Sequence, residues 1–172
     1  MFIKNFLVEN ITNSTYYYEH NIIKYIQSCA TYDIIYYMNE ISSFIYNKIF
    51  MLIIIILYLF NYFTTKQFIL LWLVHPITWL IKNLIKCNRP YINNYEIKLF
   101  DYNIIDKYSF PSGHTTFCFL IYFILLDNKI INKYYIILPL LVCISRILLG
   151  AHYITDVAGG IILAKILSLL VK

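Results

Sequence analysis

The feature that most constrains the fold is a series of long apolar runs separated by short polar stretches. The clearest run covers residues 45–63 and reads IYNKIFMLIIIILYLFNYF. A helix needs about 20 apolar residues to cross the hydrocarbon core of a membrane, and this run is long enough. Further runs predict four more spans, at about residues 67–84, 115–126, 134–149 and 157–171. The sequence therefore predicts an all-α, multi-pass transmembrane helix bundle.

The composition agrees with this prediction and disfavours one class of partner. Hydrophobic residues make up 60% of the chain and charged residues 13%, whereas soluble proteins average about 45–50% apolar residues. The net charge of +5 is not arranged as a basic stripe interleaved with aromatic residues, which is the pattern that follows a phosphate backbone. We therefore expect a membrane protein with no nucleic-acid partner.

The N-terminal quarter differs from the apolar runs. Residues 1–15 are polar and predict a loose tail, whereas residues 16–42 mix apolar residues and tyrosines with charges. Tyrosine rings suit the headgroup boundary, where their hydroxyl groups stay wet. We expect an interfacial amphipathic helix here, which gives five to six helices in total, depending on whether this segment lies in or across the membrane. Two parts follow: residues 1–44 as tail and interfacial helix, and residues 45–172 as the membrane core.

The order of the spans places most of the unusual polar residues at one face of the membrane. The opposite face collects lysines in short loops and at the end of the chain: Lys66, Lys129, Lys133 and Lys172. Short loops rich in lysine usually face the cytoplasm. The polar face is therefore predicted to be extracytoplasmic or lumenal.

Three short segments bring ionisable residues to that polar face, where they are costly and usually functional. Lys82, Arg89 and Arg146 supply three cations, and no matching carboxylate cluster is evident in the sequence. Cations in this arrangement suit a phosphate dianion, to which arginine offers forked donors. The expected ligand is therefore an anion.

The second segment, Pro111-Ser112-Gly113-His114, marks a change from loop to helix. Ser112 is a favourable N-cap residue, and Gly113 allows close approach of the backbone. Free N–H groups at a helix start bind phosphate. We expect Ser112 and Gly113 to add to the phosphate cradle.

Two histidines complete the predicted chemistry. His152 and Asp156 are four residues apart, so on one helical turn the carboxylate can accept the imidazole N–H and leave the other nitrogen free to attack. His114, from another segment, is placed to protonate the leaving oxygen and then to activate water. An alternative is a metal site formed by the same three residues. The neighbouring cations disfavour it, so we expect neither a metal nor another cofactor.

The segments Lys82…Arg89-Pro90, Pro111-Ser112-Gly113-His114 and Ser145-Arg146…His152…Asp156 resemble, in order and spacing, the three-part motif of the type 2 phosphatidic acid phosphatase superfamily. The resemblance covers about residues 45–171. It implies metal-independent hydrolysis through a phosphohistidine on His152, with His114 as acid and base and Asp156 orienting His152. It also implies phosphate binding by five residues: Lys82, Arg89, Ser112, Gly113 and Arg146.

The implied function is that of a phosphoric monoester or diphosphate hydrolase acting on a lipid phosphate or an isoprenoid diphosphate. Vanadium haloperoxidases use a similar cradle, but they are larger soluble proteins, and the predicted spans of this chain count against that alternative. A non-catalytic protein that binds anionic headgroups would need only the cations, and a transporter would place ionisable residues at mid-span. The two histidines and Asp156 favour the enzyme.

Overall fold

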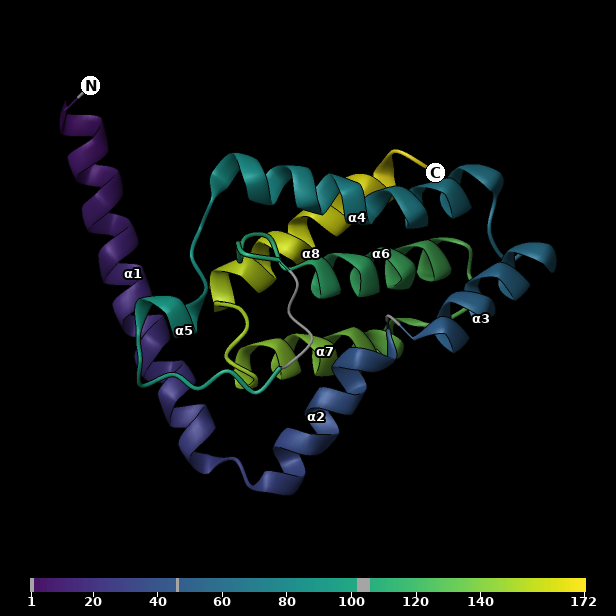
Figure 1. Cartoon of the computed structure of the whole chain (residues 1–172). Coiled ribbons are helices and arrows are strands. Elements are labelled where there is room, and N and C mark those ends of the chain that lie inside the picture. The colour runs from purple at the N-terminus through teal and green to yellow at the C-terminus, as the bar shows by residue number, and fades with distance from the viewer. Residues whose placement is uncertain (1, 46, 102–105) are drawn as a thin grey trace.

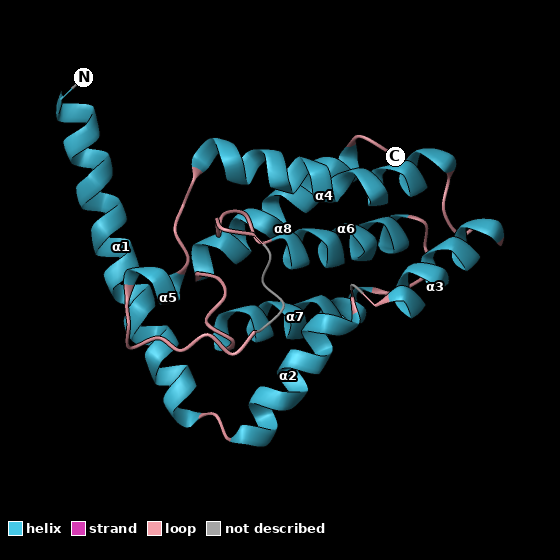
Figure 2. Cartoon of the chain, in the orientation of Figure 1, coloured by secondary structure: helices cyan, strands magenta, loops and turns pink. Residues whose placement is uncertain are grey.

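Helices are the regular secondary structure of the part of the chain that the structure describes. We describe it with a computed structural model that covers residues 2–45, 47–101 and 106–172, with side chains from Tyr16 onward. Within these ranges the chain forms helices and loops and no strand (Figure 2), which confirms the all-α prediction. The helices are α1 Phe2–Cys29, α2 Tyr32–Phe44, α3 Lys48–Leu59, α4 Thr65–Ile85, α5 Pro90–Asn93, α6 Gly113–Asp127, η1 Lys133–Ile136, α7 Ile137–Leu148 and α8 Ile154–Leu169.

Helix α6 lies at the centre of the bundle, with α4, α7 and α8 packed around it (Figure 1). Its side chains Phe117, Leu120 and Ile124 are almost fully buried. They join one apolar core with residues of the neighbouring helices, such as Val74 and Ala164. The four helices correspond to the last four predicted runs, so the pattern of apolar residues located the bundle correctly.

Helix α8 approaches the start of α6 closely, and two glycines make this possible. A Cβ atom on Gly160 would lie 2.9 Å from the carbonyl oxygen of Ser112, and one on Gly159 would lie 2.3 Å from the ring of Phe110. Both distances are shorter than a carbon contact of about 3.5–4.0 Å. The loop before α6 is therefore held directly against the first turns of α8.

The first predicted span is shorter in the structure than in the sequence analysis. Helix α3 has only 12 residues, because Asn47 caps its start by accepting a hydrogen bond from the Ile49 amide, and Asn61 takes a positive φ just beyond its end. Helices α2 and α3 are bent by 42° relative to each other, and only together are they long and apolar enough to cross a membrane. Among the described residues, the helical stretch Thr65–Asn93 is long and apolar enough by itself.

The N-terminal segment also differs from its prediction. The stretch expected to be a loose tail belongs to α1, which begins at Phe2 and contains neither glycine nor proline, the strongest helix breakers. The segment 16–42, expected as one interfacial helix, is divided between α1 and α2 because Thr31 caps the second of these. Both helices pack on α7 along one side of the bundle (Figure 1).

Candidate active site

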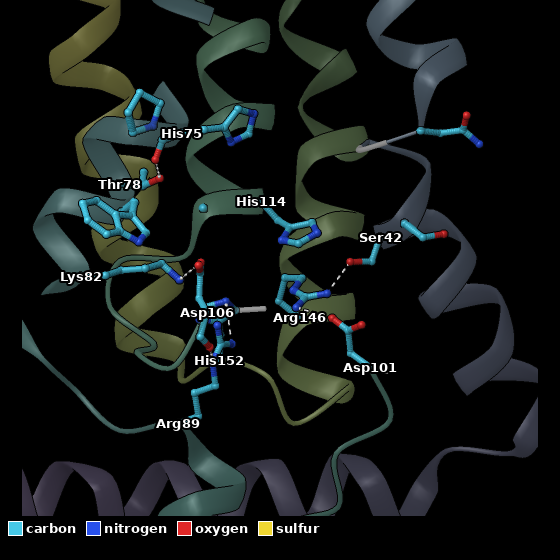
Figure 3. A pocket seen from close by; sticks show the side chains of 15 residues that line it. Ser42, His75, Thr78, Lys82, Arg89, Asp101, Asp106, His114, Arg146 and His152 are labelled. Carbon is cyan, nitrogen blue, oxygen red and sulfur yellow. Dashed lines mark hydrogen bonds and ion pairs between the residues drawn. The ribbon is translucent and has the colours of Figure 1, made fainter. Parts of the chain in front are cut away.

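A cavity of about 910 Å³ opens where α4 and α7 end and where α6 and α8 begin. Figure 3 shows that side chains from distant segments converge on it. Six of the eight predicted site residues line it: Lys82, Arg89, Gly113, His114, Arg146 and His152. The other two, Ser112 and Asp156, are almost completely buried and support the lining residues from behind.

His152 lies in the loop between α7 and α8, and its side chain is 2% exposed. Its Nδ1 atom is 3.3 Å from Oδ2 of Asp156, and the same oxygen accepts a hydrogen bond of 2.9 Å from the Tyr153 amide. The predicted pairing is therefore present, but not on one helical turn, because α8 begins only at Ile154. Asp156 is in the first turn of α8, and its carboxylate folds back over the helix start.

The partners of His152 define which of its nitrogens carries the proton. Nη1 of Arg89 lies 3.5 Å from Nε2 of His152. A guanidinium group can only donate hydrogen bonds, so Nε2 offers its lone pair, and the proton is on Nδ1, where Asp156 accepts it. Burial, and then the charge of Arg89, lower the pKa of His152 well below its usual 6.5. At neutral pH this imidazole is therefore uncharged, with the lone pair of Nε2 toward Arg89.

His114 enters the same cavity from the first turn of α6 (Figure 3). Ser112 is the N-cap of that helix, as the sequence predicted, and its hydroxyl oxygen accepts hydrogen bonds from the Thr115 amide and hydroxyl. The Ser112 amide donates to the carbonyl oxygen of Asp156 at 3.0 Å. This backbone bond joins the segment that carries His114 to the segment that carries His152.

The three predicted cations are present, but the expectation that no carboxylates face them is wrong. Nη2 of Arg146 lies 2.7 Å from Oδ2 of Asp101, and Nζ of Lys82 lies 3.1 Å from Oδ2 of Asp106. Arg89 is held by two backbone carbonyl oxygens: its Nε donates to that of Asp106, and its Nη1 donates to that of Ala151. The two aspartates lie in the long segment between the first two motifs. This position was the available signal that they could lie near the cations.

Sequence reasoning also missed a contribution from α2. Nη1 of Arg146 donates a hydrogen bond to Oγ of Ser42, which is 1% exposed and lies in the cavity wall (Figure 3). A serine in an amphipathic helix gives no signal of such a contact. Among the described residues, no group of three or more His, Cys, Asp or Glu side chains is placed to hold a metal ion.

Comparison with known proteins gives the family of the chain. The sequence model of the PAP2 superfamily matches residues 49–172, and the chain belongs to this family. The fold resembles the crystal structure of a transmembrane PAP2 type phosphatidylglycerolphosphate phosphatase from Bacillus subtilis, with a TM-score of 0.73, 24% sequence identity, and coverage of 92% of this chain and 85% of that one.

Two curated relatives match over shorter stretches. Phosphatidylglycerophosphatase B of Bacillus subtilis is 38% identical over 78 residues, which is 38% of this chain and 38% of that protein. An uncharacterized protein of Methanocaldococcus jannaschii is 37% identical over 60 residues, which is 35% of this chain and 25% of that protein. The matches thus span less than half the length of these relatives.

Proposed function

We propose that this chain is a membrane-embedded lipid phosphatase that works through a covalent phosphohistidine on His152. The observation that carries the proposal is the placement of His152, with Nδ1 toward Asp156 and Nε2 toward Arg89, in a cavity that also presents Lys82. Membership of the PAP2 superfamily supports it. Cations around a nucleophile suit the attack on a phosphate, whose negative charge they neutralise.

The reaction has two steps. Nε2 of His152 attacks the phosphorus, and the bond between phosphorus and the lipid oxygen breaks while His114, which enters this step as an imidazolium beside the phosphate dianion, gives that oxygen a proton. Water then attacks the phosphorus as His114 takes its proton, the P–N bond breaks, and inorganic phosphate leaves. Asp156 stabilises the imidazolium character that develops on His152 during the first step. Lys82, Arg89, Arg146 and the Gly113 amide hold the phosphoryl oxygens. The Ser112 amide is already bonded to the carbonyl oxygen of Asp156, so Ser112 contributes as the N-cap of α6 and not as a phosphate ligand.

The proposed substrate is a lipid phosphomonoester. Phosphatidylglycerol phosphate comes first, because a phosphatidylglycerophosphatase is among the relatives. An isoprenoid diphosphate, which the sequence analysis also predicts, presents the same terminal phosphoryl group and is the second candidate. The predicted division into residues 1–44 and 45–172 stays a prediction, with the family match beginning at residue 49.

The test is phosphate release by detergent-purified protein from phosphatidylglycerol phosphate, phosphatidic acid and farnesyl diphosphate, with EDTA present. Wild type is expected to release phosphate and to acquire acid-labile label from ³²P-substrate, whereas His152→Ala does neither. His114→Ala is expected to keep partial labelling and to lose turnover. Equal background from wild type and His152→Ala on every substrate would contradict the proposal and favour a protein that only binds anionic headgroups.

The proposal also orients the chain. Helices α4 and α7 end at the cavity, and the lysines at residues 66, 129, 133 and 172 belong to the opposite ends of the bundle helices or to the loops there. By the positive-inside rule, the cavity opens to the extracytoplasmic or lumenal side. Protease digestion of sealed vesicles should cleave a C-terminal tag only from the cytoplasmic side, and the reverse result would invert the orientation.

A further inference from the structure

Helix α1 places one face against the back of the loop that carries His152. Tyr16, Glu19, Ile23 and Gln27 are three or four residues apart and therefore lie on one side of the helix. Ile23 is fully buried in a small apolar cluster with Ile97 and Tyr153. The side-chain Nε2 of Gln27 donates to the carbonyl oxygen of Leu148 at 3.0 Å. This face of α1 thus follows the chain from the end of α7 to the start of α8.

Glu19 is the acidic residue of that face, and it is 5% exposed. Its Oε1 atom accepts a hydrogen bond of 2.9 Å from the Thr155 amide, and its Oε2 atom accepts one of 3.1 Å from the Thr155 hydroxyl. Thr155 lies in the first turn of α8, where amide groups have no partner within the helix and the helix dipole favours a negative charge. Glu19 therefore caps α8 from another helix.

Two carboxylates share the start of α8, and each takes a different amide. Asp156 accepts from the Tyr153 amide and lies beside Nδ1 of His152, whereas Glu19 accepts from Thr155, the residue directly before Asp156. Because Glu19 holds the Thr155 amide, the Asp156 carboxylate is left to Tyr153, His152 and the Ser109 hydroxyl, which donates to Oδ1 at 3.4 Å. The division of the two amides therefore contributes, together with Ser109, to the direction of the Asp156 side chain.

A second contact from α1 holds the residue that follows His152. Nε2 of His20 lies 2.8 Å from the hydroxyl of Tyr153. Nδ2 of Asn93 donates to the same hydroxyl at 3.0 Å, so the tyrosine hydrogen is available to His20. Tyr153 is fully buried, and its ring lies 4.6 Å from that of Tyr16. The chain is thus held from α1 at Tyr153 and at Thr155, on both sides of the bend that brings Asp156 to His152.

We propose that Glu19 is a positioning residue for catalysis: by holding the first turn of α8 it aligns Asp156 with His152. The proposal rests on the phosphatase function proposed above and adds a contribution from a helix that precedes the family match, which begins at residue 49. Glu19 does not line the cavity and acts through Asp156. The cations that hold phosphate come from other segments, so loss of Glu19 changes the rate of the chemical step and leaves phosphate binding intact.

The test compares Glu19→Ala, Glu19→Gln and Lys24→Gln with wild type, using kcat and KM for a lipid phosphate in mixed micelles and the Tm in detergent. Lys24 is the matched control, because it joins the same helix to Glu96 through an exposed ion pair. Misalignment of a reacting group costs about 10- to 100-fold in rate. Glu19→Ala is expected to lower kcat by about that factor with an unchanged KM. Glu19→Gln keeps one acceptor oxygen for the Thr155 amide and is expected to recover part of the rate, and Lys24→Gln should match wild type.

A double-mutant cycle separates positioning from folding. If Glu19 acts through Asp156, adding Glu19→Ala to Asp156→Asn should leave the residual kcat unchanged, because the two effects are not additive. Independent losses in the cycle, a wild-type kcat in Glu19→Ala, or equal losses in Glu19→Ala and Lys24→Gln would each overturn the inference. Should Glu19→Ala fail to fold, the isosteric Glu19→Gln carries the same cycle. An inactive wild type on every substrate would instead refute the phosphatase function.

Discussion

The two basic walls of the cavity are paired with carboxylates in different ways. Arg146 and Asp101 are both buried, with side chains 2% and 6% exposed, and their atoms approach to 2.7 Å. Lys82 is equally buried, but the side chain of its partner Asp106 is 43% exposed. Separation of Arg146 from Asp101 leaves a buried charge without its partner, whereas the exposed Asp106 can be solvated after it leaves Lys82. We therefore expect Arg146 to contribute more to the stability of the fold than Lys82 does, and a phosphate to draw Lys82 from its partner at lower cost.

The largest expected effect comes from the Arg146 wall. Arg146→Ala leaves the buried Asp101 carboxylate without its arginine, and removal of one partner of a buried ion pair costs about 3–5 kcal/mol. We expect a Tm several degrees below that of wild type together with loss of phosphate release. A thermal unfolding curve in detergent checks this, with Lys82→Ala as the comparison. Equal Tm losses in the two variants would remove the distinction between the walls.

Lys82→Ala is expected to act on activity and much less on stability. Loss of one preorganised charge at a developing oxyanion typically costs about 10²- to 10³-fold in rate. The expected kcat/KM falls by about that factor, while the Tm stays close to that of wild type because Asp106 gains solvent. Steady-state kinetics measures it. Wild-type kinetics in Lys82→Ala would show that Lys82 serves Asp106 and not the substrate.

His152 lies between the walls, and its lowered pKa predicts a pH effect on stability. In the unfolded chain His152 takes up a proton near pH 6.5, whereas in the folded protein its pKa is well below that value. The free energy of unfolding is therefore highest above pH 6.5 and falls as the pH is lowered. The slope is at most about 1.4 kcal/mol per pH unit. His152→Asn lacks this group. As the pH is lowered from 7.5 to 5.5, the Tm of wild type should therefore fall more than the Tm of His152→Asn. A constant difference between the two Tm values would contradict the pKa shift.

The smallest effect is expected at Asp106. An ion pair with one partner open to solvent is expected to be worth about 1 kcal/mol or less, so Asp106→Asn should release Lys82 to phosphate and lower the inhibition constant of inorganic phosphate by up to about fivefold. Competition assays with phosphate measure this change. A weaker affinity in the variant would mean that Asp106 positions Lys82 for the ligand and does not compete with it.

The sequence predicted the bundle better than the N-terminal segment for a physical reason. Runs such as 115–126 and 157–171 are predominantly apolar, and that property requires burial or lipid whatever the tertiary arrangement. The region before residue 45 has mixed polarity, which is compatible with an interface, a tail or a docked helix. Glu19 illustrates the ambiguity: it looks like a solvated charge in the sequence, yet it is buried against Thr155.

The site was predictable where function depends on short spacing and hidden where it depends on long-range contacts. His152 and Asp156 are four residues apart, so their pairing could be read from the sequence even though the helix begins later than expected. The contacts of Arg146 with Ser42 and Asp101 join residues 104 and 45 positions apart. No local pattern encodes such distances, because the tertiary packing creates them.

The junction between α6 and α8 bears on how this site tolerates change in its sequence. The amide of Ser112 and the carbonyl of Asp156 belong to the main chain, which every residue possesses, and Gly160 allows the two segments to touch. The spacing of the two histidine-bearing segments is therefore insensitive to most side-chain replacements around them. Substitutions in the cavity lining can therefore change its shape while this spacing is kept. A side chain at position 160 would instead push the two segments apart, because its Cβ atom would lie 2.9 Å from the carbonyl oxygen of Ser112.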